Sequence, residues 1–380
     1  MNLMFVASDN NPASGAFLSM VKLCTLLRSE FKHNVIVVLP REGEGQTLLE
    51  ENQIKYFLVK SHDWIINIKE KKEWIKRAKM YPKMLLAYFS SRKIADIIKK
   101  EKIDIVHINT SYAFYGALAA LQTRTPYVWH LREMLEEDQE REIFFKEWGY
   151  KLISKANKIV AISSAVYQKY QNILPQEKLQ LIFNGIDTTM FYSPQKQIMT
   201  EEKLKLVYGG GYARKKGIYE LASALSLLVS MGIDNFEFWL IGDSNKKYNE
   251  YLKKAGLLPY TKHLGYQKDV AQWYRQADIA FSCSAMEAFG RKTVEAMLSG
   301  CLMIAANTGG SLDIVEHEKT GLMYQQGDPI DLAYTILYAM KNKEEMKEIA
   351  KEGRTFAYKN FTAYDNAKAI SALYKKISPV

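Results

Sequence analysis

Cysteine is scarce in this chain of 380 residues, which contains only Cys24, Cys283 and Cys301. The three residues are scattered and show none of the spacings with which cysteines bind zinc, so neither a metal site nor a disulfide framework is predicted. We therefore expect a reducing compartment, the cytoplasm. No apolar run reaches the roughly 18 residues that a membrane-spanning helix needs. The first residues have the pattern of a strand and not that of a signal peptide.

Two short motifs are also absent. The sequence Asp-x-Asp occurs nowhere in the chain, which argues against a diphosphate group held by a metal ion. The glycine-rich segment from Gly209 to Gly217 is not G-x-G-x-x-G, because Arg214 stands where the third glycine would be. A dinucleotide-dependent dehydrogenase is therefore disfavoured.

Acidic residues are outnumbered, since 52 Lys and Arg face 42 Asp and Glu and give a net charge of +10. Such a charge predicts an anionic partner, which can be a nucleic acid, a nucleotide-sugar or a membrane surface. The excess is concentrated in residues 60–102, where lysines alternate with aromatic residues, Trp64, Trp74, Tyr81 and Tyr88 among them. This stretch is either a solvated face over an ordinary core or a patch that meets an anionic membrane. No nucleic-acid-binding motif accompanies it, so no nucleic acid is expected as a partner.

Short apolar segments alternate with amphipathic ones along the whole chain. This alternation is typical of βαβ units, so an α/β fold with parallel sheets is predicted. The length favours two domains. We expect them at residues 1–190 and 191–360, with a linker in the polar stretch 188–203.

Two glutamates, Glu287 and Glu295, stand on either side of seven residues. Glu287 follows a predicted strand at 277–282, and Glu295 lies about one turn into a helix that Gly300 ends. The backbone N–H groups that open this helix attract phosphate. Carboxylates accept hydrogen bonds from sugar hydroxyls. The alternative is an ordinary amphipathic helix with two exposed glutamates.

This pair resembles the E-x7-E motif of family 4 of the retaining glycosyltransferases, which have the GT-B fold. The resemblance covers nearly the whole chain and is strongest over residues 209–329. It implies two Rossmann-like domains with parallel sheets that face each other across a cleft, and a C-terminal helix at 361–380 that crosses back to the first domain. It also implies that Glu287 lies beside the donor sugar and Glu295 beside the ribose of the nucleotide.

The phosphate-binding segment matches the family only in part. Lys216 stands at the position of the family's lysine, but Gly211 stands where an arginine is expected. We infer that Arg214 or Lys215 supplies the second cation, because cationic side chains form strong contacts with phosphate. The donor-binding residues that we expect are Lys216, Arg214, Glu295, Phe289, Gly290, Arg291, Gly265, Tyr266 and Gly210.

In the first domain, the resemblance places the histidine at the end of the strand 126–133, His130, against the donor sugar. We therefore expect His130 and Glu287 to be the catalytic residues. A lone histidine can equally be a packed residue. The acceptor-side residues that we expect are Gly15, Ser14, His107 and Asn109, which follow the first strand or lie at the end of another.

The resemblance thus implies a retaining hexosyltransferase. It would move a sugar from a nucleotide-sugar, UDP-linked, to a glycan or lipid-linked saccharide in bacterial surface polysaccharide or glycoconjugate synthesis. No metal and no further cofactor are expected, and the enzyme would be cytoplasmic or peripheral on the inner face of the membrane. Two alternatives share the fold: a sugar-nucleotide epimerase and a partner subunit without catalytic activity.

Overall fold

The computed structural model describes residues 1–70, 74–243 and 245–378, and its chain forms two compact units. Unit 1 comprises Met1–Gly185 together with Ala363–Val380, and unit 2 comprises Ile186–Thr362. The division thus falls between Gly185 and Ile186, a few residues before the boundary expected at 190/191. The last helix belongs to unit 1, although the preceding 177 residues do not.

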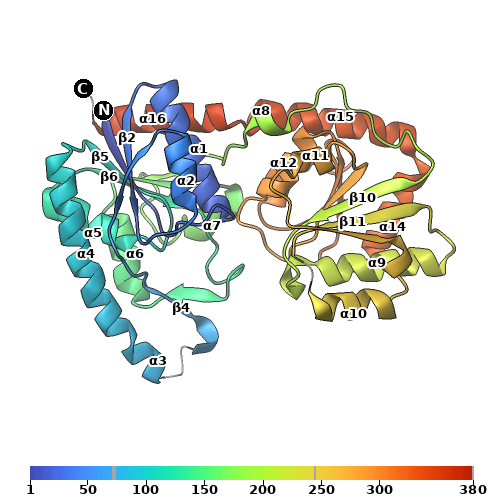
Figure 1. Cartoon of the computed structure of the whole chain (residues 1–380), viewed down its shortest axis with the longest axis horizontal. Coiled ribbons are helices and arrows are strands. Elements are labelled where there is room, and N and C mark those ends of the chain that lie inside the picture. Colours follow the sequence, from blue (N-terminus) through green and yellow to red (C-terminus); the bar gives the residue numbers. More distant parts are fainter. Residues whose placement is uncertain (71–73, 244, 379–380) are drawn as a thin grey trace. The chain divides into compact units, whose positions relative to one another are not determined.

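Unit 1 contains a seven-stranded sheet whose strands are all parallel (Figure 1). Its order is β3-β2-β1-β5-β6-β8-β9. The strands are β1 (Asn2–Val6), β2 (Asn34–Leu39), β3 (Lys55–Leu58), β5 (Ile105–Ile108), β6 (Tyr127–Leu131), β8 (Lys158–Ala161) and β9 (Leu179–Leu181). The central strands are buried throughout, as expected for a parallel sheet with helices on both faces.

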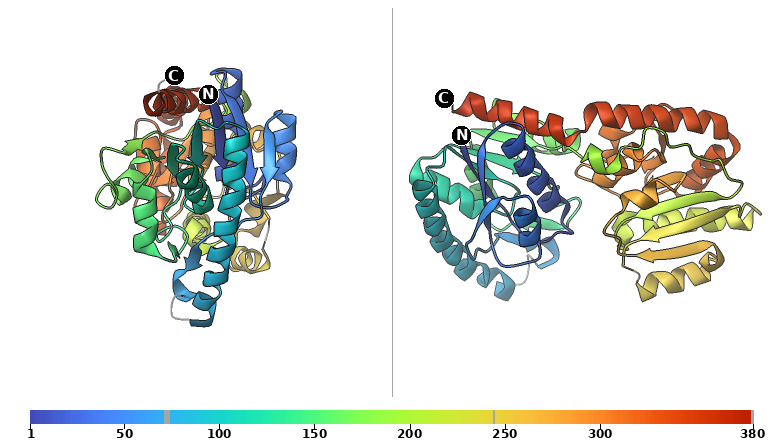
Figure 2. Two further views of the ribbon diagram at one scale, coloured as in Figure 1. Left: turned by 90° about the vertical axis from the view of Figure 1, so that its left-hand side faces the viewer. Right: turned by 45° about the horizontal axis from the view of Figure 1, so that its top comes forward.

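The helices of unit 1 cover this sheet. They are α1 (Gly15–Ser29), α2 (Gly45–Glu51), α4 (Met80–Lys100), α5 (Phe114–Thr123), α6 (Lys146–Ser154), α7 (Ser164–Tyr170) and α16 (Ala363–Ile377). Helices α1 and α16 pack together, as do α4 and α5. Leu373 and Tyr374 of α16 join Phe5 of β1 in one buried cluster. Both views of Figure 2 show the two chain ends side by side, so the C-terminal helix completes the core that the first strand begins.

The basic stretch 60–102 folds into β4 (Ile65–Asn67), η1 (Ile68–Glu70), α3 (Trp74–Ala78) and α4. Strand β4 pairs antiparallel with β7 (Arg141–Ile143). The expectation that Trp64 is an exposed aromatic is wrong, because its side chain is fully buried. Its indole N–H donates to the Ser111 carbonyl at 2.7 Å, and its ring stacks on Phe114 with centroids 4.4 Å apart.

Unit 2 contains a six-stranded parallel sheet of order β12-β11-β10-β13-β14-β15. The strands are β10 (Leu204–Gly209), β11 (Phe236–Ile241), β12 (Thr261–Gly265), β13 (Ile279–Ser282), β14 (Leu302–Ala306) and β15 (Leu322–Tyr324). Together, the two sheets confirm the predicted α/β class with two parallel Rossmann-like units.

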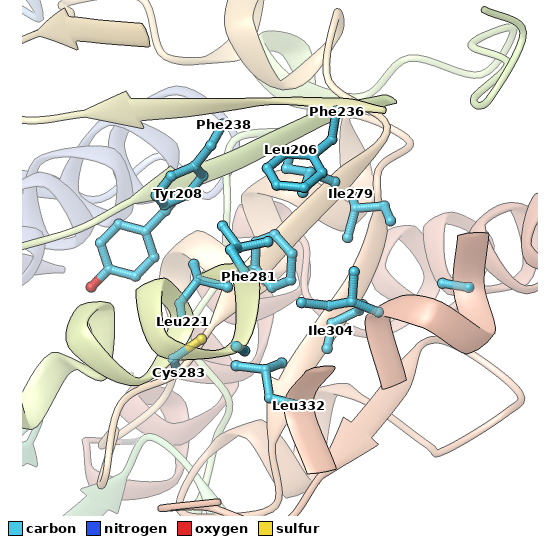
Figure 3. Packing of buried hydrophobic residues seen from close by; sticks show 14 of the residues in the cluster. Leu206, Tyr208, Leu221, Phe236, Phe238, Ile279, Phe281, Cys283, Ile304 and Leu332 are labelled. Atoms are coloured by element: carbon cyan, nitrogen blue, oxygen red, sulfur yellow. The ribbon is translucent and has the colours of Figure 1, made fainter. Parts of the chain in front are cut away.

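The helices of unit 2 form two layers over the sheet. They are α8 (Thr188–Phe191), η2 (Arg214–Lys216), α9 (Ile218–Ser230), α10 (Lys246–Lys254), η3 (Leu258–Tyr260), α11 (Ala271–Tyr274), α12 (Arg291–Leu298), α13 (Ser311–Ile314), α14 (Pro329–Lys341) and α15 (Lys343–Asn360). Helix α9 packs with α14, and α12 packs with α15 and β14. Figure 3 shows Leu221 of α9 and Leu332 of α14 packed with Phe281 of β13.

The polar stretch 188–203 is not a free linker. It carries α8, and Ile198 and Met199 are buried in the core of unit 2. Two adjacent apolar residues form neither a helical nor an alternating pattern, so periodicity does not predict their burial.

Each sheet has a point where the strand order reverses, and this point positions the loops that matter. In unit 1, β1 lies between β2 and β5, and in unit 2, β10 lies between β11 and β13. In open α/β sheets, ligands bind at the carboxyl ends of the strands where this reversal occurs. The loops that follow β1 and β5, and those that follow β10 and β13, are therefore where a site is expected in each unit.

Candidate functional site

In unit 2 the loops after β10 and β13 bring Lys216 and Glu287 together. The ammonium nitrogen of Lys216 lies 3.2 Å from Oε1 of Glu287. The same oxygen accepts a hydrogen bond from the hydroxyl of Ser284 at 2.6 Å. The side chains of Lys216 and Glu287 keep 26% and 28% of their surface exposed. Both charges are therefore held in place by protein contacts while remaining accessible from solution.

The loop that carries Lys216 is fixed by backbone contacts. The single hydroxyl hydrogen of Tyr208 is shared between two carbonyl oxygens, that of Gly211 at 3.2 Å and that of Lys216 at 3.0 Å from the hydroxyl oxygen. Gly217 adopts a positive φ of 72°, and a Cβ there would lie 1.8 Å from the carbonyl oxygen of Cys283. Only glycine permits this approach. The loop after β10 is thus packed directly against the end of β13.

Glu295 occupies the following helix, α12, whose N-cap is Gly290 with a φ of 99°. This residue is largely buried, with 9% of its surface exposed. Its Oε1 lies 3.1 Å from Nη2 of Arg291, one turn earlier on the same helix. Glu295 is therefore an oriented acceptor near the start of α12 and not a freely solvated surface glutamate.

Lys292 belongs to the same charge cluster, and the sequence analysis did not select it. Its side chain is exposed at the surface. Nearby protein nevertheless desolvates the ammonium group, and this lowers the pKa of Lys292. The positive charge of Lys216 lowers the pKa further, whereas the negative charges of Glu295 and Glu287 raise it in part. The sequence signal was available, since Lys292 stands in the first turn of the helix between the two glutamates.

The other donor-side residues that we expected lie in different settings. The Arg214 guanidinium stacks over the ring of Tyr219 at 4.5 Å. A Cβ at Gly211, the position expected to carry an arginine, would meet nothing within 4 Å, so a side chain would have room there. The ring of Phe289 is buried beside Phe361, with centroids 5.7 Å apart, so this side chain packs in the core.

The remaining donor-side residues lie on the β10–β12 side of the sheet. Gly210 follows β10, and its N–H donates to the carbonyl of Ile241 at 3.4 Å. Gly265 ends β12 with a φ of 67°, and Tyr266 directly after it is 64% exposed. The contacts described here therefore join Lys216 with Glu287, and Arg291 with Glu295, but link neither Gly265 nor Tyr266 to these pairs.

In unit 1 a buried arginine, Arg132, organises the polar residues at the ends of β5 and β6. Its Nε donates to the carbonyl and the side-chain oxygen of Asn109, both at 3.1 Å. Its Nη1 donates to the side-chain oxygen of Asn184 at 2.5 Å, and Nη2 lies 3.3 Å from Nδ1 of His130. The sequence analysis missed Arg132, although it directly follows the strand that carries His130.

His107 and His130 lie side by side in this cluster, and neither side chain is exposed. Nε2 of His107 is 2.9 Å from Nδ1 of His130, and Nδ1 of His107 is 2.7 Å from the hydroxyl of Tyr374. His107 therefore has no ring nitrogen left for a ligand, which corrects the expectation that it contacts an acceptor. Nε2 of His130 is buried and has no hydrogen-bond partner among the described residues.

The electrostatics of this pair are set by burial. Desolvation, followed by the positive charge of Arg132, holds the pKa of both imidazoles well below the ordinary value of 6.5. Both rings are therefore neutral at neutral pH.

The loop after β1 joins this cluster through Asn109. Ser14 is the N-cap of α1, and its hydroxyl oxygen accepts the N–H of Phe17 at 3.4 Å. Gly15 is the first residue of that helix. The side-chain amide of Asn109 donates to the carbonyl of Ala16 at 3.2 Å. The expected acceptor-side residues Ser14, Gly15 and Asn109 are thus neighbours at one edge of the sheet.

Glu133 is the second buried charge of unit 1, with 6% of its surface exposed. Its Oε2 accepts the N–H of Ser111 at 3.0 Å and that of Arg132 at 3.3 Å. Burial raises its pKa to about 7, although these hydrogen bonds and the nearby Arg132 charge oppose the shift. Glu133 therefore titrates near neutral pH.

The described residues contain neither a metal-binding group of side chains nor a membrane-spanning helix. Within residues 1–70, 74–243 and 245–378, no three His, Cys, Asp or Glu side chains are grouped so as to hold a metal ion. Across the same ranges, every helix is too short or too polar to cross a membrane. The absence of a metal from the reaction stays a prediction.

Both units match known sequence families. Residues 192–356 match the model of glycosyl transferases group 1, and residues 14–190 match that of glycosyltransferase family 4. The chain belongs to the glycosyltransferases. The two matches together span every strand of the two parallel sheets except β1, and they include every residue of the charge cluster in unit 2.

Two curated relatives support this membership at low identity. The chain is 23% identical over 313 residues to N-acetyl-alpha-D-glucosaminyl L-malate synthase of Bacillus anthracis, covering 77% of this glycosyltransferase and 80% of the relative. It is 24% identical over 304 residues to the capsular polysaccharide biosynthesis glycosyltransferase CapM of Staphylococcus aureus, covering 74% and 79% respectively.

A solved structure shows the same fold. Anabaena HepE in complex with UDP matches with a TM-score of 0.82 at 22% identity, over 99% of this glycosyltransferase and the whole of HepE. A second HepE structure, with UDP-glucose, gives a TM-score of 0.79. The GT-B fold expected from the sequence is thereby confirmed.

Proposed function

We propose that this glycosyltransferase moves a hexose from a UDP-sugar to a glycan or lipid-linked saccharide with retention of the anomeric configuration. The observation that carries the proposal is the cluster of Lys216, Glu287, Lys292 and Glu295 on the loops at the reversal point of the unit 2 sheet. UDP and UDP-glucose bind to HepE, which has the same fold. The names of the two curated relatives indicate that they act in capsule and glycoconjugate synthesis.

The cluster suits the chemistry of this reaction. The bond between the anomeric carbon and the phosphate oxygen breaks, and a bond from that carbon to the acceptor oxygen forms on the same face. The acceptor proton passes to the leaving phosphate. Lys216 and Lys292 stabilise the charge that develops on the diphosphate. Glu287 accepts hydrogen bonds from the sugar hydroxyls, and Glu295 accepts those of the ribose.

In this proposal His130 contacts the donor sugar, and no metal ion takes part in the reaction. The two lysines and the N–H groups at the start of α12 supply the positive charge that a divalent ion supplies in other transferases.

The test is a transfer assay with the full chain in buffer that contains a chelator. UDP-glucose, UDP-galactose and UDP-N-acetylglucosamine are offered as donors together with extracted lipid-linked saccharides, and the anomeric configuration of the product is read by NMR. Transfer of one sugar with retention supports the proposal. Conversion of the donor without an acceptor would instead identify an epimerase, and an inverted product would refute the retaining mechanism.

A second part of the proposal concerns an anionic membrane surface as a partner. The large apolar side chains on the outer side of α4 are exposed, among them Tyr81 at 60%, Leu85 at 57% and Phe89 at 50%. Lys83, Arg92 and Lys93 of the same helix are also exposed, and Asp96 is the only acidic residue of α4.

Aromatic and aliphatic side chains interleaved with basic ones suit the boundary of an anionic bilayer. Of the aromatic residues selected from the sequence, Tyr81, Tyr88 and Trp74 are exposed and Trp64 is not. Lys71 and Lys72, which the sequence placed in the same patch, lie outside the described residues. We propose that α4 rests on the membrane that carries a lipid-linked acceptor.

A further inference from the structure

Two hydrogen bonds connect the C-terminal helix to His130 inside unit 1, and a third joins Arg132 to the same imidazole. The hydroxyl of Tyr374 on α16 lies 2.7 Å from Nδ1 of His107 on β5. Nε2 of His107 lies 2.9 Å from Nδ1 of His130 on β6. Nη2 of Arg132 lies 3.3 Å from that same Nδ1. All four side chains are buried, so no solvent competes for these contacts.

The chemistry of these groups fixes where the hydrogens lie. A guanidinium group has only donors, so Nδ1 of His130 must accept from Arg132. In a neutral imidazole one nitrogen donates and the other accepts, so the His130 proton is on Nε2. Because Nδ1 of His130 is an acceptor, Nε2 of His107 must donate to it. Nδ1 of His107 then accepts, and Tyr374 is its donor.

The opposite assignment is inconsistent with the contacts. A proton on Nδ1 of His130 would face the N–H of Arg132, which puts two donors opposite each other. It would also make His107 a donor to Tyr374, so that the hydroxyl hydrogen of Tyr374 would need another acceptor. Only the first assignment satisfies all three contacts at once.

The His107 ring is also held in its plane. Phe5 stacks on it with centroids 4.4 Å apart, and Tyr374 meets it edge to face at 5.9 Å. The rings of His107 and His130 also meet edge to face, with centroids 5.1 Å apart and an angle of 66° between their planes. Rotation of His107 to exchange its nitrogens would break these packing contacts together with both hydrogen bonds.

The series of hydrogen bonds that begins at Tyr374 ends at the His130 ring, whose Nε2 takes no part in it. Nε2 of His130 is buried and finds no hydrogen-bond partner among the described residues. A buried donor without an acceptor is costly, and such groups persist where a ligand or an ordered water completes them. The contacts therefore leave a single fixed donor, the Nε2–H of His130, for which the described residues provide no acceptor.

We propose that Tyr374 is a positioning residue: its hydroxyl fixes His107 as a donor, and His107 together with Arg132 keeps the proton of His130 on Nε2, where the imidazole donates to an oxygen of the bound sugar. The identity of that ligand rests on the proposed function, whereas the position of the proton does not. His130 then serves as a hydrogen-bond donor and not as a general base. The C-terminal helix contributes to the site through one hydroxyl group besides completing the core.

The test reads the tautomers directly in the full chain without any donor sugar. The chain has six histidines, so long-range ¹⁵N–¹H NMR of imidazole-labelled protein can resolve them. His130 is assigned by comparison with His130→Gln. We expect the wild type to carry the His130 proton on Nε2. In Tyr374→Phe, which keeps the ring but removes the hydroxyl, Arg132 still donates to Nδ1, so we expect most of the His130 proton to stay on Nε2 and the share of the Nδ1-protonated form to rise about 2- to 10-fold.

Tyr127→Phe is the matched control. Tyr127 is buried in the same unit, and its hydroxyl donates to the carbonyl of Leu152 at 2.8 Å, away from the histidines. Its loss removes a comparable buried hydrogen bond, so any general loosening of unit 1 appears in both variants. Only Tyr374→Phe should change the His130 tautomer.

Kinetics supply the second readout. Tyr374→Phe should lower kcat about 2- to 10-fold, the effect of one hydrogen bond, with UDP affinity unchanged. A wild-type His130 protonated on Nδ1 would overturn the proposal, as would a Tyr374→Phe variant whose tautomer and kcat equal those of the wild type. If the tautomer shifts as expected but the wild type transfers no sugar, the proposed function is refuted, whereas the role of Tyr374 in positioning the His130 proton is supported.

Discussion

The ammonium group of Lys216 and the carboxylate of Glu287 form an ion pair of 3.2 Å between two loops of unit 2. Because this carboxylate contacts the lysine, the diphosphate of the proposed donor would compete with Glu287 for Lys216. The two residues are therefore coupled, and a change at one alters the charge that the other presents.

We predict that Glu287→Gln lowers kcat while leaving UDP affinity equal to or slightly tighter than that of the wild type. The amide keeps the shape of the side chain but releases Lys216 for the phosphates, and it weakens contacts that tighten at the transition state. Steady-state kinetics and calorimetry measure the two effects. Glu316→Gln, an exposed glutamate paired with Lys319 in the same unit, is the control and should change neither. Weaker UDP binding in Glu287→Gln would contradict the idea that Glu287 competes with the diphosphate for Lys216.

Glu295→Gln should behave differently from Glu287→Gln. A ribose contact is present in the ground state and the transition state alike, so its loss raises the KM for the donor, by about 10-fold, with little change in kcat. Arg291 remains as a hydrogen-bonding neighbour, so α12 should keep its structure. If both glutamine variants gave the same kinetic profile, the separate roles assigned to the two glutamates would be wrong.

Lys292→Gln should weaken UDP binding by about 10-fold, the effect of losing one charge-assisted contact to phosphate. Lys319→Gln in the same unit, whose lysine pairs with Glu316 on the surface, removes the same charge and should leave affinity unchanged. Calorimetry with and without a chelator tests the metal requirement in the same series. Loss of UDP binding on chelation would refute the metal-free site, and unchanged affinity in Lys292→Gln would remove Lys292 from it.

Glu133 should make unit 1 less stable as pH rises. The pKa of Glu133 is about 7 in the folded protein, and the ordinary glutamate value of 4.5 applies to the unfolded chain. Between these values the folded state binds more protons than the unfolded one, so stability falls with increasing pH through this window and the loss is complete above pH 7. The loss is at most about 3 kcal/mol.

Glu133→Gln removes this titration and keeps an oxygen that accepts the N–H of Ser111. We expect the melting temperature of the wild type to drop more between pH 5 and pH 8 than that of Glu133→Gln. The two buried histidines contribute equally to both proteins and cancel in the comparison. Glu177→Gln, at an exposed position of the same unit, should follow the wild type. Parallel pH profiles of the wild type and Glu133→Gln would contradict the prediction.

The exposed side of α4 should bind vesicles that contain anionic lipid but not neutral ones. Each basic residue near such a surface contributes about 1 kcal/mol, and the attraction is screened over about 8 Å at physiological salt. Replacing Lys83, Arg92 and Lys93 together by Gln should abolish co-sedimentation and leave UDP affinity intact.

The matched control for this experiment lies on α10. Lys246, Lys253 and Lys254 are equally exposed, and replacing them by Gln removes the same total charge from unit 2. This variant should still sediment with anionic vesicles. Equal sedimentation of both variants would show that net charge, and not α4, accounts for the binding.

The sequence by itself determined the fold class, because burial of a parallel sheet on both faces leaves a repeated pattern of short apolar runs. It also located the E-x7-E segment, because strand, loop and helix follow one another there within a few residues. The loop position of Glu287 and the helical position of Glu295 are local properties, and they were predicted correctly.

Tertiary structure decided what each side chain contacts. Trp64 and Trp74 stand in the same basic stretch, but the ring of the first is buried against Phe114, whereas the second, which the strand pairing of β4 with β7 does not include, is 76% exposed. Periodicity does not distinguish them, since the partner of β4 lies more than 70 residues further along the chain. Ile198 and Met199 were missed for the same reason.

The charged sites depended on contacts between distant segments in the same way. Lys216 and Glu287 are separated by 71 positions, and His107 and Tyr374 by 267. Hydrophobic patterning fixes which strands form, but the order in which they pair determines which loop ends meet. The sequence therefore named the residue types of both sites, and only the folded chain revealed that Glu287 holds Lys216 and that a tyrosine at the C-terminus reaches His107.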